Sequence, residues 1–198
     1  MPKMILEYKK AVISKIVETA LEIFSTKGYQ DLTMDEIAKK LGISKGALYS
    51  YFTSKDEILK EIYKNGRQTM QKILCEASQD DDLKQIMETI FKLTTEKYEK
   101  NIRIYFEILA IASHNENIKN ILKDDYEKDF EVTHEFIQNL IKAKKVRTDI
   151  DSRILAQLFR SIWIGTSEKL VLGYGVAEVH EDWVASTSYA LGATTRKS

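Results

Sequence analysis

Three helix-start signals lie close together near the N-terminus, and they constrain the fold more than any other feature of this sequence. Thr33 is followed three residues later by a glutamate, which is the spacing of a capping box, so a helix is expected to begin here. Gly42 suits the left-handed backbone conformation that ends such a helix, and Ser44 can cap the next one. A further capping signal begins at Ser54. This part of the chain is therefore predicted to form a helix, a tight turn, a second helix and the start of a third.

The second of these helices has one face that suits contact with DNA. Leu48 and Phe52 are one turn apart and are predicted to point inward, which leaves Gly46 and Ser50 on the outward side with Ala47 nearby. Small outward side chains would let the backbone approach base edges in a major groove. The outward side of this helix is therefore a candidate DNA-reading surface.

Charged and phenolic side chains flank this small surface. Tyr49 and Tyr51 fall on its two sides, where their hydroxyls are within reach of phosphates on either wall of the groove. Lys45 and Lys55 each lie in the first turn of a helix, where the helix dipole disfavours a cation by a few tenths of a kcal/mol to about 1 kcal/mol. A phosphate bound at each helix start would turn this unfavourable placement of the lysines into a favourable one. The two tyrosines and the two lysines are therefore all predicted to contact DNA.

Residues 13–59 resemble the tetracycline-repressor (TetR) family of transcriptional regulators. The match is more extensive than a bare helix-turn-helix, and it comprises Ala20, Phe24, Gly28, Tyr29, Thr33, Ile37, Ala38, Gly42, Ser44, Lys45, Gly46, Leu48, Tyr49, Phe52, Lys55 and Leu59. The resemblance implies an all-α dimer with an N-terminal three-helix DNA-binding head and a larger C-terminal domain that holds a small inducer. The resemblance implies that the residues at the family's DNA-contacting positions are, in this sequence, Thr33, Ser44, Lys45, Gly46, Ala47, Tyr49, Tyr51 and Lys55. Ser50-Tyr51 departs from the pattern, since an aromatic residue followed by His is frequent there.

Composition agrees with an all-α chain of two parts. One Pro and eight Gly among 198 residues leave few helix breakers, so long helices are predicted almost throughout. Residues 1–55 carry nine Lys against six Asp or Glu, whereas residues 56–198 carry 21 basic and 24 acidic side chains. The predicted domains are a helix-turn-helix DNA-binding domain at 1–55 and a ligand-binding and dimerisation domain at 56–198. Because the head's positive charge is modest, a dimer with two heads is expected to bind DNA more firmly.

The body is predicted to be a series of long helices. A helix from Ser54 toward Leu74 has no Pro to interrupt it, so it is expected to link the head to the body. Loops are predicted at residues 78–82, near Asn101, at His114-Asn115 and over 144–151, and the final helix at about 179–195.

The last two helices combine a broad apolar face with a face of small residues. Two chains need such faces to form a four-helix bundle about a two-fold axis, and the TetR resemblance implies a dimer interface here. The alternative is that these helices only close the chain's own core. The interface candidates are Leu158, Ile162, Trp183, Ala190 and Leu191.

The helices that the resemblance places around an inducer carry many large side chains. The candidate lining residues are Tyr63, Met87, Phe91, Tyr98, Tyr105, Phe106, Tyr126, Phe130, Phe136, Phe159 and Trp163. Such a set favours an apolar or amphipathic inducer, such as a fatty acyl thioester or a flat lipophilic drug, over a sugar or a metal ion. The acidic run 124–131 would favour a cationic drug if it faced inward. Each aromatic side chain can equally be part of an ordinary helical core.

Other function classes find less support. The sequence has no G-x-S-x-G, no Walker loop and no G-x-G-x-x-G, so the chain is predicted not to be an enzyme and to need no cofactor. Its three His lack the spacing of a helical zinc motif, and its single Cys excludes an internal disulfide and a Cys-rich metal site. The chief alternative is a helical small-molecule-binding or interaction protein without specific DNA binding.

Neither a signal peptide nor a membrane span is predicted, because no sustained apolar run follows the charged start and nowhere do eighteen apolar residues follow one another. The expected partners are a double-stranded DNA operator of near-palindromic sequence, a small inducer and a second copy of the chain. The expected location is the cytoplasm, and the simplest expected activity is repression of a promoter by a bound dimer.

Overall fold

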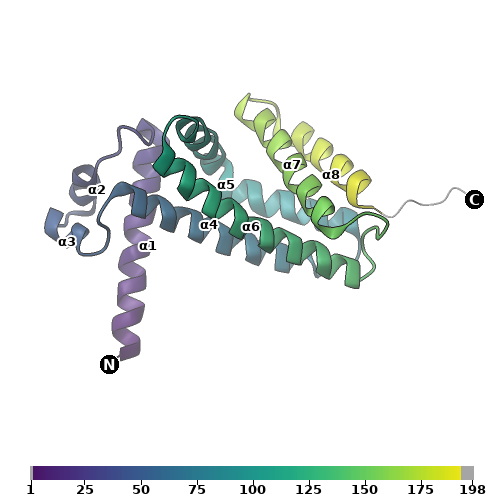
Figure 1. Cartoon of the computed structure of the whole chain (residues 1–198), viewed down its shortest axis with the longest axis horizontal. Coiled ribbons are helices and arrows are strands. Elements are labelled where there is room, and N and C mark those ends of the chain that lie inside the picture. Colours follow the sequence, from purple (N-terminus) through teal and green to yellow (C-terminus); the bar gives the residue numbers. More distant parts are fainter. Residues whose placement is uncertain (1, 193–198) are drawn as a thin grey trace, which may run out of the picture. The chain divides into compact units, whose positions relative to one another are not determined.

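The computed structural model describes residues 2–192, except for the side chains of residues 2–6 and 97–101. Every regular element in this described range is an α-helix (Figure 1), which confirms the predicted fold class. The helices are α1 (Pro2–Lys27), α2 (Met34–Leu41), α3 (Lys45–Tyr49), α4 (Lys55–Ala77), α5 (Leu83–Ala112), α6 (Glu116–Lys142), α7 (Ser152–Val171) and α8 (Val176–Leu191).

The chain divides into two compact units, and α4, α5 and α6 each contribute to both. The first unit comprises the chain up to Gly66 together with Arg103–Asp125, and the second comprises Arg67–Ile102 and the chain from Tyr126 on. The predicted boundary between residues 55 and 56 is a division by function, which these compact units do not test.

The predicted caps shape the first unit. The Thr33 hydroxyl accepts the backbone N–H of Glu36 at 3.2 Å, and Gly42 ends α2 with φ 67°. The Ser44 hydroxyl accepts the backbone N–H of Ala47 at 3.1 Å and so starts α3. The Glu36 carboxylate completes the capping box: its pKa is lowered first by the ammonium of Lys27 in α1, and then by hydrogen bonds from the Thr33 hydroxyl, at 3.2 Å, and from the Thr33 backbone N–H.

The core of the first unit is formed by the apolar faces that the sequence pattern predicts. Phe24 of α1, Ile37 of α2, Leu48 of α3 and Ile58 of α4 are at most 1% exposed and belong to one cluster. Fully burying an apolar side chain of this size stabilises a fold by about 1.5–3 kcal/mol, so these contacts hold the short helices α2 and α3 in place.

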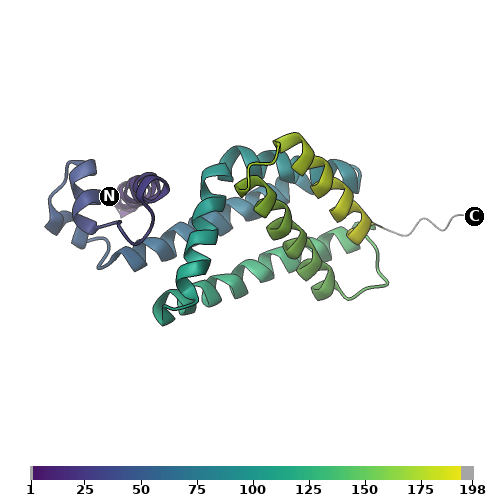
Figure 2. The same ribbon diagram turned by 90° about the horizontal axis from the view of Figure 1, so that it is seen from above.

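The second unit is built around Trp183 of α8. This side chain is fully buried, and its Nε1 donates to the backbone carbonyl of Met87 at 3.0 Å. Its ring makes edge contacts with Phe159 and Trp163, whose centroids lie 5.2 and 5.3 Å away. Helices α7 and α8 lie side by side in both views (Figures 1 and 2), and their inner faces share this aromatic core.

Two predicted helix limits differ from the structure. The predicted loop near Asn101 is wrong, because α5 continues through this residue to Ala112, and the segment has neither Pro nor Gly to end a helix. Helix α8 begins at Val176, three residues before its predicted start. The expected end of the last helix at Thr195 lies outside the described residues. The loops at 78–82, at His114-Asn115 and over 144–151 are confirmed.

Candidate nucleic-acid interface

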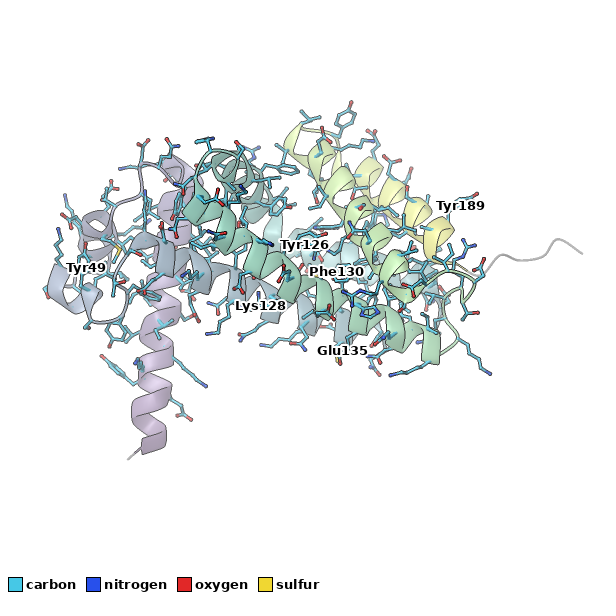
Figure 3. All side chains as sticks on the ribbon, in the orientation of Figure 1. Tyr49, Tyr126, Lys128, Phe130, Glu135 and Tyr189 are labelled. Atoms are coloured by element: carbon cyan, nitrogen blue, oxygen red, sulfur yellow. The ribbon has the colours of Figure 1, made fainter. Side chains whose placement is uncertain are left out.

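Helix α3 presents a surface of small and polar groups. Its inward residues are buried as predicted, with Leu48 0% and Phe52, just after the helix, 7% exposed. Nothing lies within 4 Å of the position that a Cβ on Gly46 would occupy, so the backbone here is open to an approaching duplex. The outward side chains are Lys45, Ala47, Tyr49 and Ser50, all of which are exposed, and Figure 3 labels Tyr49 among them.

Lys45 has a carboxylate partner at this surface. Its Nζ lies 2.7 Å from Oδ1 of Asp35 in the first turn of α2 and 5.9 Å from the centre of the Tyr49 ring. The hydrogen bond to Asp35 raises the pKa of Lys45 above its usual value, so the ammonium stays charged. An exposed pair of this kind contributes little to stability, and a DNA phosphate can compete with Asp35 for the ammonium.

Lys55 is placed differently from the prediction, since its ammonium faces protein carbonyls. Its Nζ donates to the carbonyl oxygens of Tyr29 at 2.8 Å and Gln30 at 2.9 Å, and it lies 4.7 Å from the centre of the Tyr29 ring. Lys55 therefore fixes the loop between α1 and α2 to the start of α4. An ammonium carries three N–H groups, so one remains for a phosphate.

The other predicted contact residues are also located. Thr33 and Ser44 are exposed, and each caps a helix with its hydroxyl. Tyr51 lies beyond the end of α3 and is half-buried against the core of the first unit. Together the predicted DNA contacts come from a short stretch between the start of α2 and the start of α4.

Comparison with known proteins decides which family this arrangement represents. Residues 16–62, which hold α2, α3 and the adjoining parts of α1 and α4, match the model of the bacterial regulatory proteins of the tetR family. The chain belongs to the TetR family. It is accordingly a DNA-binding transcriptional regulator and not an enzyme.

Relatives of this TetR-family regulator match it over most of its length. The biofilm operon icaADBC HTH-type negative transcriptional regulator IcaR of Staphylococcus epidermidis is 27% identical over 129 residues, covering 61% of this chain and 70% of IcaR. The HTH-type transcriptional regulator YvdT of Bacillus subtilis is 26% identical over 164 residues, covering 81% of this chain and 82% of YvdT. The solved structure of the fatty acid degradation regulator FadR from Bacillus halodurans has a TM-score of 0.71 at 16% identity, covering 87% of this chain and 94% of FadR. This last likeness shows a shared fold.

The residues predicted to surround an inducer fall in both compact units. Tyr63, Tyr105 and Phe106 belong to the first, whereas Met87, Phe91, Tyr126, Phe130, Phe136, Phe159 and Trp163 belong to the second. Of the second group, Met87, Phe91, Phe136 and Phe159 are buried in its core. The side chain of Tyr98 lies outside the described residues. A lining role for these residues stays a prediction.

Tyr63 stands out among the predicted lining residues whose side chains are described, because of its hydroxyl group. Its hydroxyl is buried and has no hydrogen-bond partner in the structure. Burial, and after it the nearby charge of Asp125, raises the pKa of this phenol, so it stays protonated at neutral pH. A buried hydroxyl without a partner costs about 1–3 kcal/mol, which a ligand acceptor would offset.

Arginines of α7 pair with the acidic run on α6. Asp129 forms an ion pair with Arg160, and Glu131 forms one with Arg153 at 3.0 Å. The Arg160 guanidinium also lies 4.6 Å from the centre of the Tyr126 ring, and Arg153 lies 4.9 Å from that of Phe130. Figure 3 labels these two aromatic residues on α6. Two carboxylates of the run are thus matched by protein cations, which weakens the case for a cationic inducer at this place.

The predicted dimer interface needs a correction at two positions. Trp183 and Leu191 are fully buried in the core of the second unit, so their side chains cannot form a seam between two chains. Leu158 is 37% exposed, and Ile162 and Ala190 are half-buried. Ile154 and Tyr189 were not among the interface candidates, yet they are 54% and 89% exposed, because helical spacing alone does not tell which apolar face a neighbouring helix covers.

No helix of the described part has an apolar stretch long enough to cross a membrane. Among those same residues, His, Cys, Asp and Glu form no group of three or more that could hold a metal ion.

Proposed function

We propose that this TetR-family regulator is a homodimeric repressor that reads a near-palindromic operator and releases it when a small apolar or amphipathic molecule binds. The functional boundary lies near residue 55, with the DNA-reading residues before it and the ligand-binding and dimerising residues after it. The proposed DNA contacts are Thr33, Ser44, Lys45, Gly46, Ala47, Tyr49, Ser50, Tyr51 and Lys55.

The exposed face of α3 carries this proposal. The helix is held by the buried Leu48 while Gly46 stands open, so base edges can come close to its backbone. Lys45 and Tyr49 stand beside this opening and offer a cation and a hydroxyl to phosphates. Since IcaR is named a negative regulator, occlusion of a promoter is the activity to test first.

A footprint on an operator selected from random duplexes tests DNA reading. Two heads related by a two-fold axis should protect two inverted half-sites in successive major grooves. Tyr49→Ala should weaken binding to operator and random DNA alike, whereas Ala47→Val should change the preferred bases. A protein that binds no duplex at low salt would instead favour a helical ligand-binding protein without DNA reading.

The proposed dimer seam is the exposed side of α7 and α8. Ile154, Leu158, Ser161 and Gly165 follow one another at helical spacing, and all four are exposed. Tyr189 extends from α8 with 89% of its surface exposed. An apolar stripe bordered by small residues permits close approach of a second copy, as a four-helix bundle requires.

A charge in this stripe tests the seam. Leu158→Asp would bury an unpaired carboxylate between the two chains, which costs several kcal/mol, so we expect the dimer to dissociate at micromolar concentration. Leu109→Asp is the matched control, because Leu109 of α5 is 47% exposed and lies outside the proposed seam. Light scattering measures the mass of both variants. A monomeric wild type, or equal dissociation in the two variants, would refute the seam.

The proposed inducer is apolar or amphipathic. Its support is the large number of aromatic side chains in the body, together with the pairing of Asp129 and Glu131 by arginines. Candidate lining residues are Tyr63, Met87, Phe91, Tyr98, Tyr105, Phe106, Tyr126, Phe130, Phe159 and Trp163. Because FadR is named a fatty acid degradation regulator, fatty acyl thioesters are the first compounds to test, followed by lipophilic drugs.

A thermal-shift screen of acyl thioesters, lipophilic cations and polar metabolites tests the inducer class. A ligand that binds only the native state raises the melting temperature, and an inducer must also release operator DNA by its differential affinity for two states. Stabilisation and DNA release by hydrophilic metabolites alone would show that the apolar class is wrong.

A further inference from the structure

Tyr29, in the loop between α1 and α2, has every polar group engaged by another part of the first unit. Its backbone N–H donates to Glu107 Oε1 of α5 at 2.6 Å, and its carbonyl accepts the Lys55 ammonium at 2.8 Å. Its hydroxyl donates to the carboxylate of Asp56, which also accepts the side-chain amide of Asn117 from α6. With only 4% of its surface exposed, Tyr29 is a buried junction between the α1–α2 loop and the three helices α4, α5 and α6.

Gly28 is required for this junction. Its φ of 84° lies in the left-handed region, and a Cβ placed on it would lie 2.8 Å from Glu107 Oε1. A glycine therefore permits the carboxylate to approach the backbone closely enough to accept the Tyr29 N–H. Burial, and then the bond to Asp56, raises the pKa of the Tyr29 hydroxyl, so this group remains a donor at neutral pH.

Two members of the junction lie far from the DNA-reading residues in the sequence. Glu107 is 78 residues beyond Tyr29, and Asn117 is 61 residues beyond Asp56. Neither belongs to residues 16–62, which match the family model. Their hydrogen bonds nevertheless end on the loop that precedes α2 and on the first turn of α4.

We propose that Glu107 and Asn117 are positioning residues for DNA reading, which act through Tyr29 and Asp56 to set the orientation of α2 and α3. The loop from Gly28 leads directly into α2, and α3 follows α2 after a short turn closed by Gly42. A hydrogen bond to a base edge tolerates only a few tenths of an ångström, so a small tilt of α2 changes which base contacts α3 can make. Phosphate contacts by flexible lysines tolerate the same tilt better.

Electrostatics alone predicts the opposite effect for Glu107. Removing a carboxylate from a DNA-binding unit lowers its repulsion of phosphates and should strengthen DNA binding. Loss of the positioning contact should weaken binding to the operator and leave binding to random DNA unchanged or slightly stronger. The sign of the change in operator affinity therefore separates the two effects.

The experiment compares Glu107→Ala, Glu107→Gln and Asn117→Ala with wild type in the full-length chain. Glu116→Ala is the matched control, because this exposed α6 glutamate forms an ion pair with Lys119 of its own helix at 3.0 Å. Fluorescence anisotropy gives the affinity for an operator selected by the wild-type protein and for random duplex. Circular dichroism at the same temperature confirms that each variant is folded, so lost stability cannot account for lost affinity.

We expect Glu107→Ala and Asn117→Ala to bind the operator about tenfold more weakly, because each variant loses a hydrogen bond that positions the α1–α2 loop or the start of α4, with random-duplex affinity not reduced. Glu107→Gln keeps one acceptor oxygen and should recover part of the affinity. Amide exchange of Tyr29 should be faster in Glu107→Ala than in Glu116→Ala. Operator binding by folded Glu107→Ala as tight as wild type or tighter would overturn the proposal, as would unchanged binding by Asn117→Ala. If Glu107→Ala does not fold, the Asn117→Ala result decides.

Discussion

Two glycines at positive φ provide a quantitative test of how the first unit is held together. Gly42 and Gly28 have φ 67° and 84°, and an alanine in the left-handed region costs about 1–2 kcal/mol. Nothing lies within 4 Å of a Cβ on Gly42, so Gly42→Ala should lose only this amount. The two positions thus share one source of strain.

Gly28→Ala should cost more because of its neighbour. The new Cβ would lie 2.8 Å from Glu107 Oε1, so the carboxylate must leave the Tyr29 N–H. Loss of this charged hydrogen bond adds about 1.5–3 kcal/mol, for a total of about 2.5–5 kcal/mol. In a chain of this length, a loss of 1 kcal/mol in the free energy of unfolding lowers the melting temperature by roughly 2–4 °C.

Urea unfolding followed by far-UV circular dichroism measures both variants. We expect the free energy of unfolding to fall by about 2 kcal/mol more for Gly28→Ala than for Gly42→Ala. In the double variant Gly28→Ala/Glu107→Ala, the second change should cost less than it does alone, because the hydrogen bond is already lost. Equal losses for the two glycines, or additive losses in the double variant, would refute the reasoning.

Three further outcomes can be measured. Asp35→Asn should free Lys45 from its 2.7 Å ion pair and so strengthen binding to random DNA. In an anisotropy titration at several salt concentrations, the slope of log affinity against log salt should steepen by up to about one phosphate contact, and an unchanged slope would contradict this. Trp183→Phe removes the 3.0 Å bond to a backbone carbonyl of α5 and should lower the free energy of unfolding by about 1–3 kcal/mol, which chemical unfolding tests. The hydrogen bond from Arg147 lowers the pKa of Asp149 to about 2, so the contribution of this pair to stability should be complete above about pH 4 and lost toward pH 2. The difference in free energy of unfolding between wild type and Asp149→Asn should therefore narrow as the pH falls through that range.

Local signals accounted for the helices of the DNA-reading part. The hydroxyls of Thr33 and Ser44 cap α2 and α3 as their positions predict, since a cap needs only residues within one turn. Leu48 is buried and Gly46 is open, as the helical spacing requires. The outward face of α3 could therefore be identified from a few neighbouring residues.

Contacts between distant segments escaped the same reasoning. Lys55 was assigned to DNA from its place in the first turn of a helix, yet its ammonium binds two carbonyls of a loop 25 and 26 residues earlier. Trp183 was assigned to a dimer seam, yet the aromatic residues of α7 enclose it. In both cases the helix and its apolar or charged face were predicted correctly, whereas these contacts within the chain were not predicted.

The all-α class, the caps and turn around α3, and the resemblance to the TetR family could be predicted from the sequence, because these features depend on side chains and backbone within a few residues of one another. The contact of Glu107 with Tyr29, the ion pair of Asp35 with Lys45, and the burial of Trp183 but not of Leu158 became evident only in the folded chain. Those placements depend on which of several apolar faces pack together, and hydrophobic burial is non-directional, so one sequence pattern is compatible with many pairings until the whole core is assembled.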